Sequence, residues 1–85
     1  MKHQVVLTPK AEKELKKIPQ EHYKNIISSL VSLSDDPYGG KKLKGDYKKC
    51  YSLRVWPYRI IYQIYKSKLI IIVISIGHRQ KVYKR

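Results

Sequence analysis

The sequence predicts a single α+β domain in which a helical hairpin packs on a mostly antiparallel four-stranded sheet, in the order β-α-α-β-β-β. A strand-like run at residues 4–7 opens the chain, two segments with helical spacing of apolar residues follow, and three strand-like runs fill the last third. The 85 residues make one domain, 1–85. A chain of this size buries only about 60–65% of the surface that it exposes when unfolded, so its core is modest.

The two helices are marked by their ends and by their apolar stripes. Thr8 and Pro9 provide an N-cap and a first-turn proline, and Pro19 separates the first helix from the second. The second helix ends before Pro37, because proline disfavours helical backbone in the residue before it. The stripes comprise Ala11, Leu15 and Ile18 in the first helix, and Tyr23, Ile26, Ile27, Leu30, Val31 and Leu33 in the second.

Strands are predicted at residues 50–55, 58–65 and 69–76, after a loop at residues 38–49. The short connections between these strands indicate antiparallel hairpins. The last run is apolar on both faces for most of its length, which predicts an interior strand. Strict alternation directs Arg54 and Arg59 away from the apolar faces of their strands. In the last strand it groups Ile70, Ile72, Ile74 and Ile76 on one face, and Val73, Ser75, Gly77 and Arg79 on the other.

The charge of the chain indicates a polyanionic partner. Nineteen basic against six acidic residues give a formal net charge of +13. Such an excess favours nucleic acid, an anionic membrane or an acidic protein, and with eight tyrosines and one tryptophan we favour nucleic acid or the ribosome. Cys50 is the only cysteine, which excludes an internal disulfide. No apolar run approaches the roughly 20 residues of a membrane-spanning helix, and no signal peptide is visible, so we expect a cytoplasmic protein without membrane contact.

The arginines of the last third form the candidate site. Arg54, Arg59 and Arg79 lie in or just after three neighbouring strands, and Tyr83 follows them. A compact cationic cluster on a rigid sheet suits a phosphate backbone and the extra charge that develops on it during cleavage. The loop before the strands adds lysines that we interpret as a basic rim, although a lysine run is also typical of a solvated loop. These are Lys41, Lys42, Lys44, Lys48 and Lys49.

Other chemistries find little support in the sequence. No carboxylate lies in a strand run, whereas a two-metal nuclease needs several converging carboxylates, so we predict no metal and no cofactor. RNA can be cleaved without metal, because its own 2′-OH attacks the adjacent phosphate. Arginine stabilises the resulting charge but carries protons poorly, which leaves the acid–base partner open. His78 is a candidate, although alternation directs its side chain away from Arg79.

Several blocks of the chain resemble the RelE/ParE superfamily of toxins from toxin–antitoxin systems. The resemblance covers nearly the whole chain. Its specific parts are the Tyr-Arg-(apolar)2-Tyr block at residues 58–62 and the Gly-His-Arg ending at residues 77–79 with Val-Tyr at residues 82–83. The helices are generic. The resemblance implies the RelE-like fold.

Within the superfamily the chain looks like the RelE branch. This implies a ribosome-dependent endoribonuclease that cleaves mRNA in the ribosomal A site, where it would contact 16S rRNA. It also implies an acidic RelB-like antitoxin as partner. Arg54, Arg59, Arg79 and Tyr83 match site positions of that branch, and Lys42 and Lys44 match loop positions that meet ribosomal RNA. Ser52 stands where some members carry a basic residue, and Arg54 where some carry lysine. The alternatives are a ParE-like inhibitor of DNA gyrase and a catalytically degenerate, RNA- or ribosome-binding relative.

Overall fold

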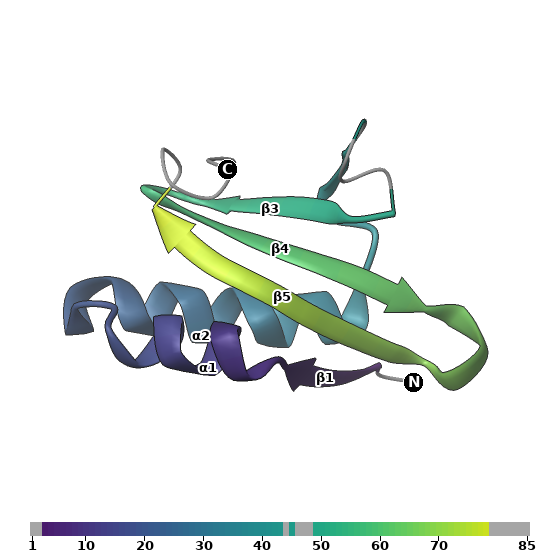
Figure 1. The fold of residues 1–85 in the computed structure, drawn as a ribbon, viewed down its shortest axis with the longest axis horizontal. Helices are drawn as coiled ribbons and strands as arrows, with labels where there is room; N and C mark the ends of the chain where they lie inside the picture. The colour runs from purple at the N-terminus through teal and green to yellow at the C-terminus, as the bar shows by residue number, and fades with distance from the viewer. Residues whose placement is uncertain (1–2, 44, 46–48, 79–85) are drawn as a thin grey trace.

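A computed structural model describes residues 3–43, 45 and 49–78 of the chain, and it confirms two helices on one face of a sheet (Figure 1). The sheet has five strands in the order β1-β5-β4-β3-β2, one more than the sequence predicted. Among the described residues, no helix is long and apolar enough to cross a membrane. The elements are β1 (Gln4–Leu7), α1 (Pro9–Lys16), α2 (Gln20–Asp35), β2 (Lys41–Lys42), β3 (Tyr51–Val55), β4 (Tyr58–Tyr65), the short 3₁₀ turn η2 (Lys66–Lys68) and β5 (Ile70–His78).

The additional strand, β2, lies within the segment that the sequence predicted as a loop. Lys41 and Lys42 pair antiparallel with Ser52 and Tyr51 of β3, and the Leu43 amide continues this edge by donating to the Cys50 carbonyl at 3.0 Å. Two exposed lysines carry no apolar alternation, so no pattern in the sequence marks them as a strand. Tertiary placement of the chain after α2 decides the pairing instead.

The last strand, β5, is interior, as its apolar sequence predicted. It pairs in parallel with β1, from Gln4↔Ile70 to Leu7↔Val73, and antiparallel with β4 on its other side. Parallel strands require a crossover connection. The helices belong to that crossover, and both lie on the same face of the sheet in Figure 1.

The core lies between the helices and the facing side of the sheet. It comprises Ala11, Ile18, Ile26, Leu30 and Leu33 from the helical part, and Ile60, Tyr62, Ile71, Val73 and Ile76 from β4 and β5. The predicted stripe of α2 is too wide, because Val31 is 61% exposed and Tyr23 39% exposed. A helix that rests on one side of a sheet buries only the part of its surface that meets the strands.

A β-bulge in β5 overturns the predicted alternation of that strand. Tyr62 pairs with Val73 but Ile61 pairs with Ser75, so Ile74 is an extra residue without a partner in β4. The bulge changes the faces that follow it. Ile76 therefore shares the core with Val73, rather than sharing a face with Ile70 and Ile72 as strict alternation required.

Thr8 joins the start of α1 to this bulge. Its hydroxyl oxygen accepts a hydrogen bond from the Ala11 amide at 3.2 Å, which confirms the predicted N-cap. The same hydroxyl donates to the Ile74 carbonyl at 3.1 Å. One side chain thus satisfies a free amide of the helix and a carbonyl of the bulged strand.

We expect Thr8→Ala to lower the free energy of unfolding by about 1–2 kcal/mol, because both hydrogen bonds are lost. Thr8→Ser is the matched control, since it keeps the hydroxyl and should remain close to wild type. Urea denaturation followed by circular dichroism measures both. Equal midpoints for the alanine and serine variants would contradict this role of Thr8.

Candidate nucleic-acid interface

Arg54 and Arg59 lie directly opposite each other in the β3–β4 hairpin. Their neighbours Leu53 and Ile60 belong to or pack against the core on the helix side. Because successive side chains of a strand point to opposite faces, the two arginines project from the outer face of the sheet. Arg54 is exposed, whereas Arg59 is half-buried and its Nε is buried. The prediction that both arginines avoid the core face is confirmed.

A pocket of about 390 Å³ brings four of the predicted site residues together: Lys41, Ser52, Arg54 and Arg59. Gly39 and Gly40 complete one wall, and none of the described lining residues is acidic. Lys41 pairs with buried Ser52, so β2 carries its charge next to the strand of Arg54. Three cationic side chains around one hollow have the charge to bind a phosphate group, and guanidinium groups can donate to it in pairs.

The remaining candidates are distributed more widely. Lys42 and Lys49 are exposed but do not line this pocket. Lys42 pairs with Tyr51 at the sheet edge. Four predicted residues lie outside the described part of the chain: Lys44, Lys48, Arg79 and Tyr83.

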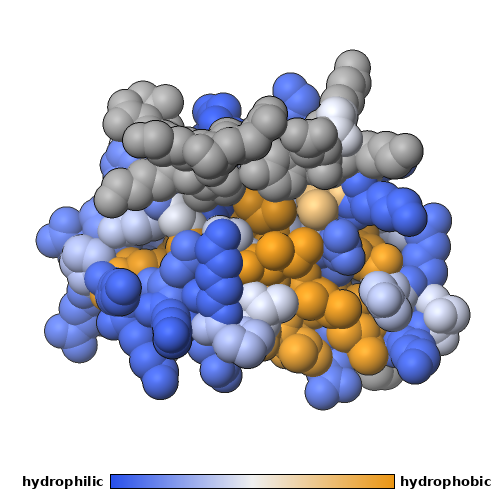
Figure 2. Space-filling model, viewed as in Figure 1, coloured by the Kyte–Doolittle hydropathy of each residue, from blue (hydrophilic) through white to orange (hydrophobic). Residues whose placement is uncertain are grey.

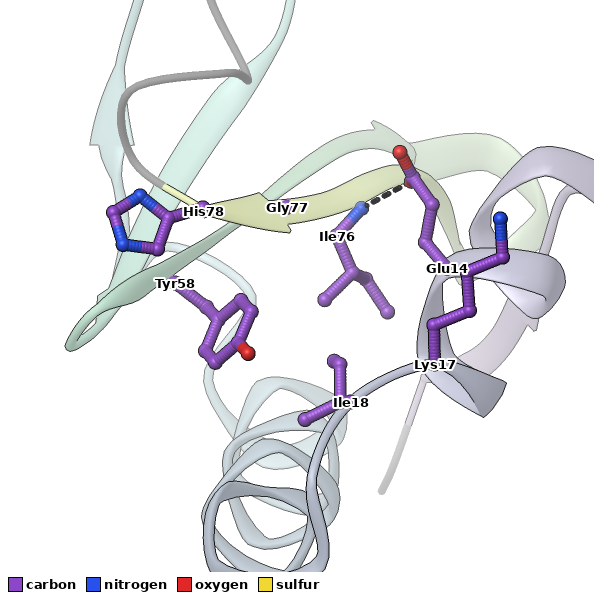
Figure 3. A pocket seen from close by; sticks show the side chains of 7 residues that line it. All are labelled: Glu14, Lys17, Ile18, Tyr58, Ile76, Gly77 and His78. Carbon is purple, nitrogen blue, oxygen red and sulfur yellow. Dashed lines mark hydrogen bonds between the residues drawn. The ribbon is translucent and has the colours of Figure 1, made fainter.

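His78 lies at a different pocket, on the helix side of the sheet. It pairs with Tyr58 across β4 and β5, and the two rings lie edge to face with centroids 6.1 Å apart. Figure 3 shows this pocket, of about 560 Å³, with Glu14 and Lys17 on the opposite side from His78. The neighbouring position, Gly77, pairs with Arg59. The strand therefore separates the imidazole from the arginine pocket, as alternation indicated.

The Glu14 carboxylate lines that second pocket and accepts hydrogen bonds from β5. Its Oε1 accepts from the Ile76 amide at 2.8 Å and from the Ser75 hydroxyl at 3.1 Å. The pairing of β1 with β5 ends at Val73, so on this stretch of β5 the carboxylate provides a partner that no strand supplies. We assign Glu14 a role in holding the bulge. Within the described residues, no group of three or more histidine, cysteine or acidic side chains is placed to hold a metal.

Sequence reasoning missed two residues beside the arginine pocket, Gly40 and Tyr62. The Tyr62 hydroxyl donates to the Pro37 carbonyl at 2.8 Å and accepts from the Gly40 amide at 3.1 Å. Burial raises the pKa of Tyr62, so the hydroxyl keeps the proton that it donates. Gly40 lies in the predicted loop at residues 38–49, and Tyr62 ends the Tyr-Arg block at residues 58–62. The sequence contains both segments, but nothing in it indicates that Gly40 and Tyr62 meet in the fold.

We expect the outer-face arginines to bind single-stranded RNA. Arg54→Ala and Arg59→Ala should each weaken binding by about tenfold and reduce the slope of log K against log salt by roughly 0.7, because each removes one phosphate contact. Lys24→Ala is the control, since it removes the same charge from exposed α2. Fluorescence anisotropy with a labelled oligonucleotide at several salt concentrations measures this. Equal losses in all three variants would show that net charge alone matters.

Comparison with known proteins adds independent information. A family model described as the ParE toxin of the type II toxin–antitoxin system parDE matches residues 5–83. A protein of Escherichia coli described as a RelE-like toxin is 32% identical over 84 residues, which is 95% of this chain and 87% of that protein.

Solved structures agree in fold. In the RelBE2 toxin–antitoxin complex of Mycobacterium tuberculosis, the similar chain has a TM-score of 0.86 at 25% identity, over 93% of this chain and 100% of that one. The isolated RelE toxin of Escherichia coli gives a TM-score of 0.76 at 30% identity, over 95% of this chain and 90% of that one. The expected helical hairpin on a sheet is thus the fold of known toxins.

Proposed function

The chain belongs to the RelE/ParE superfamily of toxins from type II toxin–antitoxin systems, and we propose that it is an endoribonuclease of the RelE branch. In this proposal it cleaves mRNA in the ribosomal A site and so stops translation in the cytoplasm. The observation that carries the proposal is the pocket lined by Lys41, Arg54 and Arg59, which has no acidic side chain among its described lining residues. The resemblance in sequence to a RelE-like toxin points the same way.

The chemistry follows from the charges around this pocket. The 2′-OH of the nucleotide loses its proton and attacks the adjacent phosphate, and the phosphorane that forms carries more negative charge than the starting diester. The bond from phosphorus to the 5′ oxygen then breaks, which leaves a 2′,3′-cyclic phosphate and a protonated 5′-hydroxyl. Fixed guanidinium groups stabilise the charge of the phosphorane without reorganising. Arg54 and Arg59 supply two such groups, and Arg79 supplies the third in our proposal. Ser52 lines the same pocket, and we assign its hydroxyl a supporting contact to this phosphate.

Proton transfer requires a different group, because arginine stays protonated at any ordinary pH. We assign Tyr83 to this step or to stacking on a base, because a phenol can donate or accept a proton and its ring can stack. Replacement by phenylalanine keeps stacking and removes proton transfer. His78 is a poor candidate, because it faces the pocket on the helix side. The ribosome supplies the remaining positioning, with the lysines of residues 41–49 contacting ribosomal RNA.

A second candidate function is inhibition of DNA gyrase, which the match to the ParE toxin family model favours. A gyrase inhibitor acts by protein binding and leaves translation running, so an in vitro translation reaction separates the two functions. Supercoiling by purified gyrase is the complementary assay. Arrest of translation with intact supercoiling supports the ribonuclease, and the reverse pattern supports the gyrase inhibitor.

We expect Arg59→Ala and Arg79→Ala to lower the rate of mRNA cleavage on ribosomes by about 10²–10³, because each removes a preorganised cation. Cleavage is read by toeprinting on ribosomes stalled with a defined codon in the A site. Lys24→Ala, on the surface of α2, is the charge-matched control and should cleave at the wild-type rate. Naked mRNA should be cleaved poorly by every variant. A folded Arg59→Ala protein that cleaves at the wild-type rate would remove Arg59 from the site.

We expect an acidic antitoxin that covers the outer face of the sheet. On this face half-buried Ile70 and Ile72 and 39% exposed Val6 lie beyond the arginines, in the register of β1, β5 and β4. Figure 2 shows hydrophobic side chains gathered over the β1–β5 part of the molecule. An amphipathic acidic segment matches such a surface and would fold on it. The similar Mycobacterium tuberculosis chain was solved in a toxin–antitoxin complex.

Co-expression with the neighbouring open reading frames, followed by pull-down and a growth assay, tests this expectation. An acidic neighbour should co-purify and restore growth. Val6→Asp should weaken the complex, because it places a negative charge against an acidic partner. Lys24→Ala, which also lowers the net charge by one, is the control for charge alone. Full growth arrest in the presence of the bound acidic protein would contradict inhibition by this partner.

A further inference from the structure

Tyr62 connects the core to one wall of the arginine pocket. Its ring is fully buried and stacks on Tyr51, with centroids 5.6 Å apart and planes 20° apart. Its hydroxyl leaves this stack and reaches the segment that follows α2, at Pro37 and Gly40. Figure 1 shows the chain leaving α2 and passing β4 on its way to the sheet edge beyond β3. One side chain of β4 therefore holds both ends of the four-residue turn.

Gly40 allows the turn to approach this closely. A Cβ at position 40 would lie 2.5 Å from the Tyr62 hydroxyl and 2.9 Å from the Ser52 carbonyl oxygen. Both distances are shorter than real Cβ contacts, and the Ser52 backbone belongs to β3. Any larger residue must therefore move the turn away from the sheet. The close approach exists because glycine stands opposite a hydroxyl.

The turn at residues 37–40 leads to one wall of the arginine pocket, and strand β4 carries the other wall. Lys41 follows Gly40 directly and begins β2, whereas Arg59 lies three residues before Tyr62 in β4. Lys41 and Arg59 both line the pocket of about 390 Å³. The hydrogen bond from the Gly40 amide to the Tyr62 hydroxyl thus connects the strand that carries Arg59 with the turn that precedes Lys41. Arg59 is held by the ladders on both sides of β4, whereas Lys41 is held by the two-residue pairing of β2 with β3 and by the turn that precedes it.

We propose that Tyr62 is a positioning residue, whose hydroxyl sets the distance across the pocket between Lys41 and Arg59 and so its affinity for a phosphate of RNA. This inference deepens the proposed function and rests on it for the identity of the ligand. The hydroxyl does not touch the substrate. It acts through the Gly40 amide and the first residue of β2.

Tyr62→Phe is the direct test, because it keeps the buried ring and the stack and removes only the hydroxyl. The Gly40 amide then loses its acceptor, and its hydrogen exchange should accelerate by about tenfold. Affinity for a short 2′-O-methyl RNA, which cannot be cleaved through its 2′ oxygen, should fall by about two- to tenfold. On ribosomes the half-saturating concentration should rise by a similar factor, while the rate at saturation remains within about twofold.

Tyr51→Phe is the matched control, since it removes a hydroxyl from the neighbouring ring of the same stack. It should leave the Gly40 exchange and the RNA affinity at wild-type values. Unchanged Gly40 exchange or unchanged RNA affinity in Tyr62→Phe would overturn the proposal. Equal losses in both tyrosine variants would overturn it as well, because they would indicate a general loosening of the core.

Gly40→Ala provides a second test that does not depend on removal of the hydroxyl. The new Cβ pushes the turn from the sheet, so RNA affinity should fall by about tenfold or more. In the Tyr62→Phe background, Gly40→Ala should reduce RNA affinity by a smaller factor, because the new Cβ no longer meets the Tyr62 hydroxyl. Strict additivity of the two losses would contradict the coupling. Failure of the wild type to cleave on ribosomes would reject the proposed function, while exchange and RNA binding still decide the role of Tyr62.

Discussion

One extra residue in β5, Ile74, determines how the two faces of the sheet are used. Beyond the bulge, Gly77 stands opposite Arg59 and Ile76 opposite Ile60. Counting the register without the bulge would place Ile76 opposite Arg59. A glycine beside Arg59 leaves room for a guanidinium on the outer face, and an isoleucine beside Ile60 fills the core. The bulge thus serves both the packing and the site.

Helix α1 holds this irregular backbone from the other side of the sheet. The Thr8 hydroxyl binds the Ile74 carbonyl, and the Glu14 carboxylate binds the Ile76 amide. A bulge interrupts the ladder and leaves polar groups that need partners. The side chains of Thr8 and Glu14 supply these partners from the helix side. The position of Arg59 next to β5 therefore depends on side chains that do not reach the outer face. Variation in α1 can therefore affect the site through β5.

Much of the fold could be predicted from local signals in the sequence. The strands at residues 4–7 and 58–65, the Thr8 cap and the interior place of the last strand were all visible in apolar spacing and in turn residues. Two features could not be predicted. The bulge at Ile74 lies in an unbroken apolar run, where either face can enter a core. The strand β2 is made of two lysines, and its pairing with β3 depends on where the fold places the chain after α2. The same limit applies to the site, where Arg54 and Arg59 followed from alternation but Gly40 and Tyr62 required contacts across the fold.

The repulsion between Arg54 and Arg59 lowers the stability of the β3–β4 hairpin, and apolar packing on the helix side of the sheet offsets this loss. Like charges directly across two strands are destabilising. Leu53 and Ile60, the neighbouring pair on the helix side, contribute apolar burial to the same hairpin. We propose that this pair of cations, which weakens its own hairpin, serves to bind a polyanion. The fold alone does not separate a ribonuclease from a gyrase inhibitor. In our proposal the distinction rests on the side chains of the outer face, where the register of β3 and β4 brings Arg54 and Arg59 together.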